Sequence, residues 1–592
     1  MSITRIFDLL DHSRKHFPKE DMVAGKQDGI WRKYSTDEFI RLADELSRGL
    51  IALGIKKDEK VAVMSDNRPE WNISDFAIMQ IGATQVPMYP TLAENDVRYI
   101  LQDAEVKIAF VSDQLLYEKL DRARLSLQSD LKIYTFYPIP GVSNWKDVLQ
   151  LGKENSDIDL DSFRDKVSPE DLLTLIYTSG TTGTPKGVML THNNLLSNVI
   201  NSSVMYPEGF KKALSFLPLS HIFERMVLYM YIYIGASVYY AESMETIVTD
   251  IQQVKPHGFT TVPRLLEKVY DRIVSKGTEL TGIKRKLFVW ALNLGLRYEL
   301  NGKNGAWYEF QLKLANKMIF NKWREALGGN ILALVSGGAA LQPRLARVFW
   351  AAGMPVLEGY GLTETSPVIT VNGLKAGQTM FGTVGKTIKD VEVKIAADGE
   401  ILCKGPNVMR GYYKRPDLTA EAIDENGFFH TGDIGELIEG VYLRITDRKK
   451  EIFKTAGGKY VAPQVLENKL KESIFIEQVM VLGENERFPS ALIVPSFVHL
   501  KEWCLSTDIP FTSNIDIVIN KAVIDKIQQE VDERNQQFGH WEQVKKIQLL
   551  PAEWSIEGGE LTPKLSLKRK VILEKNKEAI EKIYRNTENI EI

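Results

Sequence analysis

The hydrophobic pattern near the start of the chain switches between helical spacing and short apolar runs. Between residues 39 and 50 apolar side chains recur every three or four positions, after a capping-box pattern formed by Ser35 and Glu38. Gly54 ends this stretch, and another helical stretch begins at Glu70. Apolar runs typical of strands occupy 60–64, 84–88, 107–111 and 131–136. This alternation predicts the α/β class, with a parallel or mixed sheet sandwiched by helices.

Residues 226–241 contain five tyrosines and no charged residue. This run is shorter than the ~20 residues that a membrane-spanning helix needs, and Gly235-Ala236-Ser237 interrupts it. We therefore expect a buried helix followed by a buried strand.

Residues 281–327 have a second distinctive pattern. Apolar residues fall at helical spacing at Tyr308, Leu312, Ala315, Ile319 and Trp323. The segment 284–290 is both basic and aromatic. The pattern predicts a pair of surface helices packed on the core, and a membrane-surface patch that collects an amphipathic substrate is the alternative.

Composition narrows the function classes. The 592 residues are 44% hydrophobic and 26% charged, which is typical of a globular protein. The net charge of −3 gives no basic field for nucleic acid, so no nucleic-acid partner is expected. Cys403 and Cys504 lie far apart without metal-ligand spacing, and the first residues have no apolar signal segment. We expect a cytoplasmic protein with reduced thiols.

The most informative segment is the small-residue loop 177–188, Tyr-Thr-Ser-Gly-Thr-Thr-Gly-Thr-Pro-Lys-Gly-Val, which two apolar runs flank. Its glycines let backbone N–H groups approach an anion, and its hydroxyls and lysine suit phosphate. The residues concerned are Thr178, Ser179, Gly180, Thr181, Thr182, Gly183, Thr184, Lys186 and Gly187. The spacing is not that of a Walker loop. A phosphate-binding loop is predicted, with an ordinary polar hairpin as the alternative.

A second glycine-rich segment, Glu358-Gly-Tyr-Gly-Leu-Thr-Glu364, follows the apolar stretch that ends at Leu357. Glycines flank Tyr360, whose ring can stack on a base. Thr363 offers a hydroxyl to phosphate, and Glu364 offers a hard oxygen ligand to Mg²⁺. By itself the segment is equally compatible with a glycine-rich turn that carries a carboxylate.

Together these motifs closely resemble those of the adenylate-forming superfamily, and most of all the long-chain-fatty-acid–CoA ligases within it. The resemblance runs through the whole chain in the family's order. It implies an α/β adenylate-forming fold: a large N-terminal domain of sheets sandwiched by helices plus a β region, and a smaller mobile α+β C-terminal domain. The domains are expected at 1–446 and 447–592, with a hinge at Asp447.

The resemblance implies roles for the nucleotide-binding residues. Tyr360 would stack on adenine, Thr363 would meet the α-phosphate and Glu364 would hold Mg²⁺. The same nucleotide and acyl-entrance region would include Gly337, Gly338, Ala339, Glu358, Gly359 and Gly361. In the His430-Thr-Gly-Asp433 motif Asp433 would accept hydrogen bonds from the ribose hydroxyls, with Arg448 as the second ribose contact.

The resemblance also implies roles in the two half-reactions. His221 would flank the substrate carboxylate, although a lone histidine beside apolar residues is more often a packed side chain. Lys454, Gly457 and Gly458 would enter the site for the thioester step and approach pantetheine.

The chain departs from the family near its C-terminus. Long-chain members read Leu-Thr-Pro-Thr-Leu-Lys, whereas this chain reads Leu561-Thr-Pro-Lys-Leu-Ser566 and places serine where the essential lysine is expected. In an extended strand residues 564, 566 and 568 would share one face. Lys564 or Lys568 could then replace the missing lysine, and we favour Lys564; a slow adenylation step is the alternative.

The function expected from the resemblance is ATP-dependent activation of a long-chain fatty acid through acyl-AMP, followed by transfer to CoA. ATP, Mg²⁺ and CoA are the expected cofactor and co-substrates. Peripheral contact with the inner face of the membrane and a homodimer stay open. So do two other functions: a fatty acyl-AMP ligase that loads a carrier protein, and a catalytically weak lipid- or nucleotide-binding relative.

Overall fold

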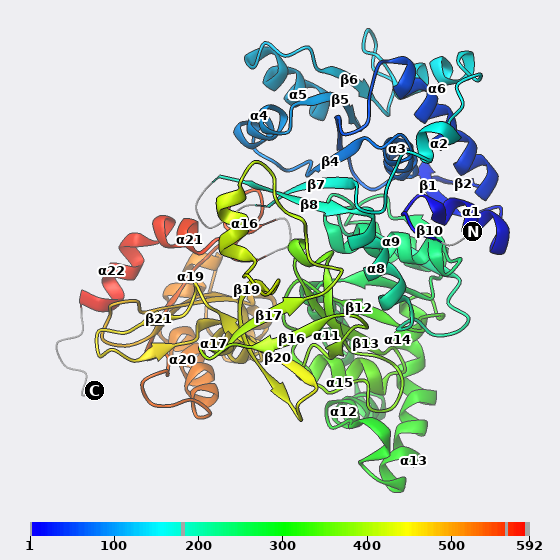
Figure 1. The fold of residues 1–592 in the computed structure, drawn as a ribbon. Coiled ribbons are helices and arrows are strands. Elements are labelled where there is room, and N and C mark those ends of the chain that lie inside the picture. Colours follow the sequence, from blue (N-terminus) through cyan, green and yellow to red (C-terminus); the bar gives the residue numbers. More distant parts are fainter. Residues whose placement is uncertain (1–2, 179–183, 563–565, 586–592) are drawn as a thin grey trace. The chain divides into compact units, whose positions relative to one another are not determined.

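The computed structural model describes residues 3–178, 184–562 and 566–585, which form two compact units (Figure 1). The larger unit comprises Met1–Lys394, Leu402–His430 and Glu439–Leu443. The smaller unit comprises Ile395–Ile401, Thr431–Ile438 and Arg444–Ile592. The chain thus enters the smaller unit more than once, whereas the sequence analysis divided it once, at Asp447. That boundary and its hinge stay predictions.

The larger unit contains two large mixed sheets. The first has seven strands, in the order β18 (Gly411–Tyr412), β8 (Lys186–Thr191), β7 (Leu172–Thr178), β4 (Thr84–Met88), β3 (Lys60–Met64), β5 (Val106–Val111) and β6 (Lys132–Thr135). The second has nine, in the order β15 (Lys386–Thr387), β14 (Val368–Val371), β13 (Val356–Gly361), β12 (Leu334–Ser336), β11 (Gly258–Thr261), β9 (Lys212–Ser215), β10 (Ser237–Tyr240), β1 (Val23–Gln27) and β2 (Ile30–Tyr34). In the first sheet β7, β4, β3, β5 and β6 run parallel.

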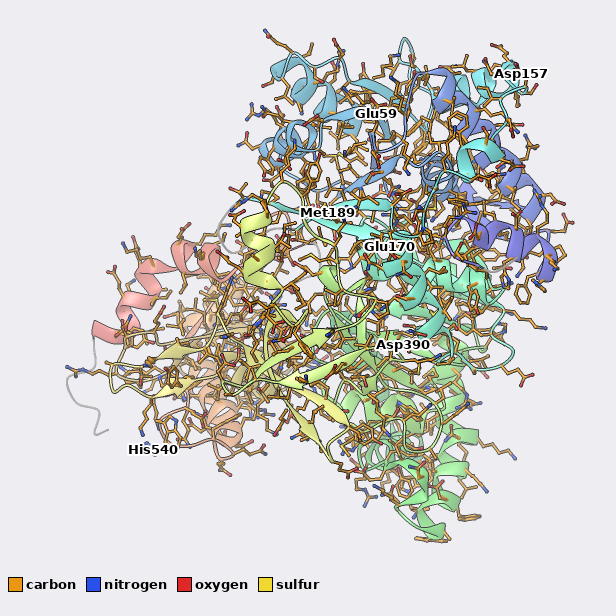
Figure 2. The ribbon with its side chains drawn as sticks, in the orientation of Figure 1. Glu59, Asp157, Glu170, Met189, Asp390 and His540 are labelled. Carbon is orange, nitrogen blue, oxygen red and sulfur yellow. The ribbon has the colours of Figure 1, made fainter. Side chains whose placement is uncertain are left out.

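Helices cover these sheets. They are α1 (Asp8–His16), α2 (Thr36–Ala52), α3 (Pro69–Gln80), α4 (Glu94–Asp103), α5 (Gln114–Ser126), α6 (Trp145–Glu154), α7 (Asp161–Arg164), α8 (His192–Ser203), α9 (Ile222–Tyr233), α10 (Ile247–Val254), α11 (Pro263–Thr278), α12 (Gly282–Leu296), α13 (Ala306–Ala315), α14 (Asn321–Ala326), α15 (Pro343–Ala351) and α16 (Pro416–Ala422). A π-helical turn (Asn316–Phe320) joins α13 to α14. Figure 2 adds the side chains, among them Met189 on β8.

Side chains on each sheet alternate between two cores, as the pleat of a strand requires. On β3, Val61 and Val63 belong to one hydrophobic cluster, whereas Ala62 and Met64 belong to another. On β10 of the second sheet, Val238 joins the same cluster as Val61. Both sheets therefore share this inner layer, which α2, α3, α8 and α9 fill. The predicted arrangement of sheets sandwiched by helices is confirmed.

Most predicted elements of the first 140 residues are confirmed, but the capping box is only half formed. Ser35 Oγ accepts the Glu38 N–H at 3.1 Å and so caps α2. The Glu38 carboxylate instead accepts a hydrogen bond from Arg32 at 3.3 Å. The box prediction is wrong in this second half because an arginine on the preceding hairpin competes for the carboxylate.

The tyrosine-rich run forms the expected buried helix and strand, α9 and β10. Its phenolic hydroxyls have polar partners: the Tyr240 O–H donates to Asn72 Oδ1 at 2.7 Å, and the Tyr231 and Tyr206 oxygens lie 3.2 Å apart. Just before the run, Arg225 forms a fully buried ion pair with Asp75 on α3. Among the described residues, no helix has the length and apolar content to cross a bilayer.

The smaller unit has its own sheet and cores. Its sheet has the order β23 (Ile476–Leu482), β24 (Ser490–Pro495) and β25 (Lys546–Leu549). One face packs on α17 (Pro463–Leu470), α18 (Phe497–Ser506), α19 (Asn514–Ile519) and α20 (Lys521–Asn535), and the other on α21 (Arg569–Lys575) and α22 (Lys577–Arg585). The hairpin β21 (Phe453–Lys454) and β22 (Tyr460–Val461) precedes them. A further sheet, of which only the residues within 395–401, 431–438 and 444–448 belong to this unit, has the order β16 (Glu392–Ile395), β17 (Glu400–Lys404), β19 (Phe429–Ile438) and β20 (Tyr442–Arg448).

Candidate active site

The predicted phosphate-binding loop joins two antiparallel strands. Thr178 ends β7 and lies opposite Lys186, which begins β8. The strand–loop–strand expectation is therefore confirmed at its two ends. Thr184 is exposed and Lys186 is half-buried. The five residues between them that the sequence analysis named, Ser179, Gly180, Thr181, Thr182 and Gly183, lie outside the described residues.

One tyrosine connects the lysine of this loop to the predicted magnesium ligand. Tyr412 donates its hydroxyl hydrogen to Glu364 Oε1 at 3.0 Å. Its ring centroid lies 5.0 Å from Lys186 Nζ, a cation–π distance. Burial and the neighbouring carboxylate raise the pKa of Tyr412, so the phenol stays protonated and keeps donating. Tyr412 thus contacts both Lys186 and Glu364, which are 178 positions apart in the sequence.

Residues next to Tyr412 also form backbone hydrogen bonds with the phosphate-loop segment and with the segment 358–364. The Met409 N–H donates to the Glu364 carbonyl at 2.8 Å, and the Tyr413 N–H donates to the Gly187 carbonyl at 2.8 Å. Sequence reasoning missed Tyr412. Its local signal is only the glycine and two tyrosines at 411–413, which say nothing about a partner 48 positions away.

Several other predicted residues gather at one edge of the nine-stranded sheet. Strands β9, β11, β12 and β13 run parallel, so their carboxyl ends share that edge. His221 follows β9 and caps α9, where its Nδ1 accepts the Phe223 N–H at 3.1 Å. The residues Gly337, Gly338 and Ala339 follow β12, and Gly359, Tyr360 and Gly361 end β13. The carboxyl edge of parallel strands is where open α/β sheets bind ligands.

The start of α9 packs directly on the glycine segment after β12. A Cβ atom on Gly337 would lie 3.1 Å from the Phe223 ring, and Gly338 has a φ of +82°, a left-handed conformation that favours glycine. Gly338 and Ala339 are exposed. His221 and the predicted acyl-entrance segment therefore meet through Phe223.

Two carboxyls at this edge are buried, and burial raises the pKa of each. Desolvation raises the pKa of Glu358 on β13 to about 8, and that of Glu224 on α9 to about 7. Ser336 Oγ, paired in register with Glu358, is buried and has no hydrogen-bond partner within the described chain. Thr363 is buried and Glu364 is half-buried.

The donor set suits a magnesium ion that arrives with a nucleotide. Within the described ranges, no three His, Cys, Asp or Glu side chains gather closely enough to hold a metal ion. Mg²⁺ is commonly bound through one or two carboxylates together with substrate phosphates and water. A single carboxylate, Glu364, which Tyr412 connects to Lys186, fits that mode.

In the smaller unit, the structure brings the predicted ribose pair together. The Asp433 carboxylate is 8% exposed and lies 3.4 Å from Arg448 Nε. Asp433 is on β19 and Arg448 ends β20. Lys454 Nζ lies 4.5 Å from the Tyr460 ring centroid. Gly457 and Gly458 form the exposed β21–β22 turn.

The predicted hinge residue is buried and anchored. Asp447 Oδ1 accepts the Arg448 N–H at 2.6 Å, and Oδ2 accepts the Gln464 N–H at 3.3 Å. Burial, together with Glu451 and Glu467 nearby, raises the pKa of Asp447 to about 7. These bonds tie the strand end to the start of α17.

The structure describes only part of the C-terminal segment that carries the two candidate lysines. An antiparallel bridge joins Leu561 to Leu567, and the Thr562 N–H donates to the Ser566 carbonyl at 2.9 Å. The expected shared face of residues 564, 566 and 568 stays a prediction, because 563–565 lie outside the described residues. Lys568 is exposed at the N-cap of α21, and Lys564 lies outside the described residues.

Arg569, next to Lys568, fixes the start of α21. It forms an ion pair of 2.7 Å with Glu467, and the carboxylates around it raise its pKa despite burial. The basic run after Ser566 is thus partly structural.

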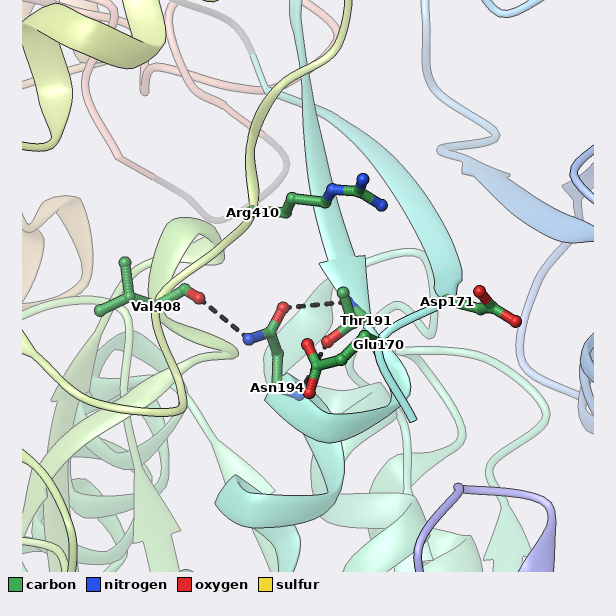
Figure 3. A pocket seen from close by; sticks show the side chains of 6 residues that line it. All are labelled: Glu170, Asp171, Thr191, Asn194, Val408 and Arg410. Atoms are coloured by element: carbon green, nitrogen blue, oxygen red, sulfur yellow. Dashed lines mark hydrogen bonds between the residues drawn. The ribbon is translucent and has the colours of Figure 1, made fainter. Parts of the chain in front are cut away.

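An open pocket of about 480 Å³ in the larger unit contains none of the predicted site residues (Figure 3). Its lining residues are Glu170, Asp171, Thr191, Asn194, Val408 and Arg410. The Asn194 amide donates to the Pro406 and Val408 carbonyls at 2.8 and 2.9 Å. Lys57 pairs with Asp171 at 2.6 Å. These polar groups are engaged by the protein, so we do not place the reaction in this pocket.

Comparison with known proteins adds to this geometry. The family model described as AMP-binding enzyme matches residues 10–413, and the AMP-binding enzyme C-terminal domain matches residues 451–588. The long-chain-fatty-acid–CoA ligase FadD15 of Mycobacterium bovis is 34% identical over 568 residues, covering 94% of this chain and 93% of the relative. The human long-chain-fatty-acid–CoA ligase 6 is 32% identical, covering 94% of this chain and 83% of the relative.

Solved structures share the fold. The adenylation domain of a carboxylate reductase from Mycobacterium chelonae matches with a TM-score of 0.75 and 22% identity, covering 98% of this chain and 91% of that domain. An anthranilate CoA ligase in complex with anthranoyl-AMP matches with a TM-score of 0.72 and 17% identity, covering 98% of each chain. The expected adenylate-forming fold, with a large N-terminal α/β domain and a C-terminal domain, is confirmed.

Proposed function

The chain belongs to the AMP-binding enzyme family and is an adenylate-forming, acyl-activating enzyme, and we propose that it is a long-chain-fatty-acid–CoA ligase. The observation that carries the proposal is full-length similarity, at 34% and 32% identity, to ligases of that name from a bacterium and from human. The proposed reactants are a long-chain fatty acid, ATP and CoA, and the proposed location is the cytoplasm. A homodimer stays an untested expectation.

In the proposed first half-reaction, a carboxylate oxygen of the fatty acid attacks the α-phosphorus of ATP. A P–O bond forms, the bond to the leaving pyrophosphate breaks, and acyl-AMP results. Lys186 and the loop hydroxyls would hold the phosphates in line and offset their charge. Glu364, oriented by the Tyr412 O–H, would hold Mg²⁺, which supplies charge neutralisation on the phosphates. Tyr360 and Thr363 would contact adenine and the α-phosphate.

The proposed adenosine contacts also include Asp433 and Arg448, whose 3.4 Å approach suits recognition of a vicinal diol. An ionised carboxylate accepts hydrogen bonds from hydroxyl groups, and the guanidinium beside it can donate to the same diol. The segments 337–339 and 358–361 would line the base and the acyl entrance.

In the proposed second half-reaction, the thiolate of CoA attacks the acyl carbonyl carbon, the C–O bond to AMP breaks, and the thioester forms. His221 would flank the carboxyl group, and the Lys454–Gly458 turn would approach pantetheine. We propose that Asp447 is the hinge about which the smaller unit rotates between the two half-reactions.

A catalytically weak relative is the second candidate, because Ser566 takes the place of the family's essential lysine when the segment is aligned without gaps. A ligase that passes the acyl group to a carrier protein would share the first half-reaction. Both candidates differ from the proposal in products that can be measured.

The test is AMP release and product mass with ATP, Mg²⁺ and acids from acetate to stearate, with and without CoA. We expect palmitoyl-CoA and AMP only when CoA is present, and much lower turnover with acetate. Acyl-AMP that accumulates in the presence of CoA would indicate the carrier-protein ligase. Failure to turn over any acid would favour the weak relative.

A further inference from the structure

Helix α13 has two apolar faces, and the core covers only one of them. Tyr308, Leu312 and Ala315 are buried in the cluster that includes α12 and α15. Another set of apolar side chains, on α13 and the π-helical turn that follows it, recurs three or four positions apart and stays exposed: Trp307 (71%), Phe310 (53%), Leu314 (39%) and, in the turn, Met318 (40%). We call these four side chains the α13 stripe. The predicted packing of this helix on the core is confirmed, yet it does not explain the stripe.

The stripe forms a continuous surface rather than scattered contacts. Successive members differ by three, four and four positions, which places them on one side of a helix. The Trp307 and Phe310 rings stack on each other, with centroids 5.6 Å apart and an interplanar angle of 21°. In Figure 1, α13 lies at the end of the larger unit farthest from α4, α5 and α6.

The start of helix α12 adds an apolar side chain and three basic side chains to the same surface. The Trp290 Nε1–H donates to Gln311 Oε1 at 3.3 Å, and the Tyr308 O–H donates to the Leu294 carbonyl at 2.5 Å. These bonds fix an antiparallel pairing, which extends to contacts between α12 and the 316–320 turn. The start of α12 therefore lies at the level of Met318. There Ile283 is 76% exposed, and the exposed residues Lys284, Arg285 and Lys286 follow it.

The net charge of this region is opposite in sign to the net charge of the whole chain. Residues 282–326 contain nine lysines and arginines and three glutamates, a net charge of +6, whereas the chain carries −3. Lys313 on α13 and Lys317 in the π-helical turn that follows are both exposed, and they adjoin the stripe residues Leu314 and Met318 in the sequence. Long basic side chains next to an apolar stripe can keep their charges at a phosphate layer while the apolar groups enter below it.

We propose that the α13 stripe and its basic flank are a docking surface for an anionic phospholipid bilayer, into which Trp307 and Phe310 insert. Exposed aromatic residues on one helix face, bordered by lysines, have the chemistry of interfacial helices. A second copy of the chain docked through the same face would bring one +6 region against another, which like-charge repulsion opposes. The surface would hold the enzyme where an amphipathic acid is most concentrated.

Vesicle flotation with the full-length protein tests the proposal, without ATP or CoA, so its result is separate from the reaction. We expect binding to vesicles of phosphatidylcholine with phosphatidylglycerol, weakened by salt, and much less to phosphatidylcholine alone. The double variant W307S/F310S should lower binding about tenfold or more, and K313Q/K317Q about tenfold. The matched control is L115S/L125S on α5, where leucines that are 69% and 61% exposed are replaced; it should bind as the wild type does.

Quenching of tryptophan fluorescence by brominated lipids adds a measurement that does not depend on loss of binding. W307F should keep binding but lose part of the quenching, because Trp307 is the ring placed in the bilayer. Unchanged quenching, or normal binding by W307S/F310S, would overturn the proposal. The proposal would also be overturned if the wild-type protein failed to float with anionic vesicles. If the variants altered only self-association in analytical ultracentrifugation, the face would be a homodimer interface instead.

Discussion

At the scale of single residues, the account depends most on Tyr412, because its O–H and its ring reach Glu364 and Lys186 respectively. A hydroxyl that donates to a carboxylate restricts that carboxylate to one orientation. The residue therefore acts through Glu364 and is a positioning residue in the proposed reaction.

Replacing Tyr412 by phenylalanine keeps the ring beside Lys186 but removes the hydrogen bond. We expect the Mg²⁺ concentration for half-maximal rate to rise, with a rate loss of about tenfold at low Mg²⁺, the size of a charge-assisted hydrogen bond. Steady-state rates across a Mg²⁺ titration measure this. Tyr413→Phe is the matched control, because the Tyr413 ring centroid lies 5.2 Å from Lys60 Nζ and from Lys414 Nζ rather than beside Lys186. A Y412F enzyme with an unchanged Mg²⁺ dependence would contradict the positioning role.

Glu358 predicts a pH dependence of stability. Its folded pKa is about 8, whereas its ordinary value is 4.5, so between these pH values the folded state keeps a proton that the unfolded state releases. Stability should therefore fall as pH rises through this window. Glu358→Gln is neutral in both states, so its Tm relative to wild type should rise by a few degrees between about pH 5 and pH 8.

The control for that experiment is Glu118→Gln, which changes an exposed glutamate on α5. Its Tm difference from wild type should stay constant with pH. A Glu358→Gln difference that is also constant, or that shrinks as pH rises, would mean that this carboxyl ionises normally in the folded protein.

Local motifs could be predicted from the sequence, whereas contacts across the fold could not. The loop 177–188 and the segment 358–364 carry their chemistry in adjacent residues, so their composition was informative. The Tyr412–Glu364 bond spans 48 positions, and the Arg569–Glu467 pair spans 102. No spacing rule connects residues so far apart, and neither contact was predicted.

At the scale of elements, the predictions are confirmed where the burial of a single strand or helix determines its pattern of apolar residues. The runs at 60–64 and 84–88 match β3 and β4 because central parallel strands are apolar on both faces. The pairing of Leu561 with Leu567 was not predicted, because the apolar pattern of a segment does not specify which partner it pairs with.

The C-terminal element separates the two candidate lysines. Lys568 is an exposed residue that begins α21, and its N–H donates to the Glu560 carbonyl at 2.7 Å. We expect Lys568→Ala to retain adenylation within about threefold, whereas Lys564→Ala should slow it about 100-fold, as loss of a charge-stabilising donor does. Pyrophosphate exchange measures this step.

The same two variants should form thioester normally from preformed palmitoyl-AMP, since the lysine serves only the first step. Equal adenylation rates in Lys564→Ala and wild type would show that the lysine function has been lost or moved from this segment. A 100-fold loss in Lys568→Ala instead would assign it to Lys568.

At the scale of the whole molecule, the proposed hinge predicts that the two half-reactions can be uncoupled. Asp447→Pro should leave pyrophosphate exchange within a few-fold of wild type but slow thioester formation about 100-fold, because the acceptor would be misplaced. Asp447→Asn is the matched control, since its amide oxygen can still accept one of the two N–H groups, from Arg448 or Gln464, that the carboxylate accepts, and it does not restrict the backbone. Equal retention of both half-reactions in Asp447→Pro would refute the hinge.

The central claim is that this chain makes acyl-CoA through an acyl-AMP intermediate, and oxygen tracing tests it most directly. Palmitate labelled with ¹⁸O in its carboxyl group is incubated with ATP, Mg²⁺ and CoA, and the products are analysed by mass spectrometry. The account predicts palmitoyl-CoA together with AMP that carries one ¹⁸O, because the attacking carboxylate oxygen stays on the phosphorus when the thiol displaces AMP. Unlabelled AMP, label in inorganic phosphate, or the absence of palmitoyl-CoA would contradict it.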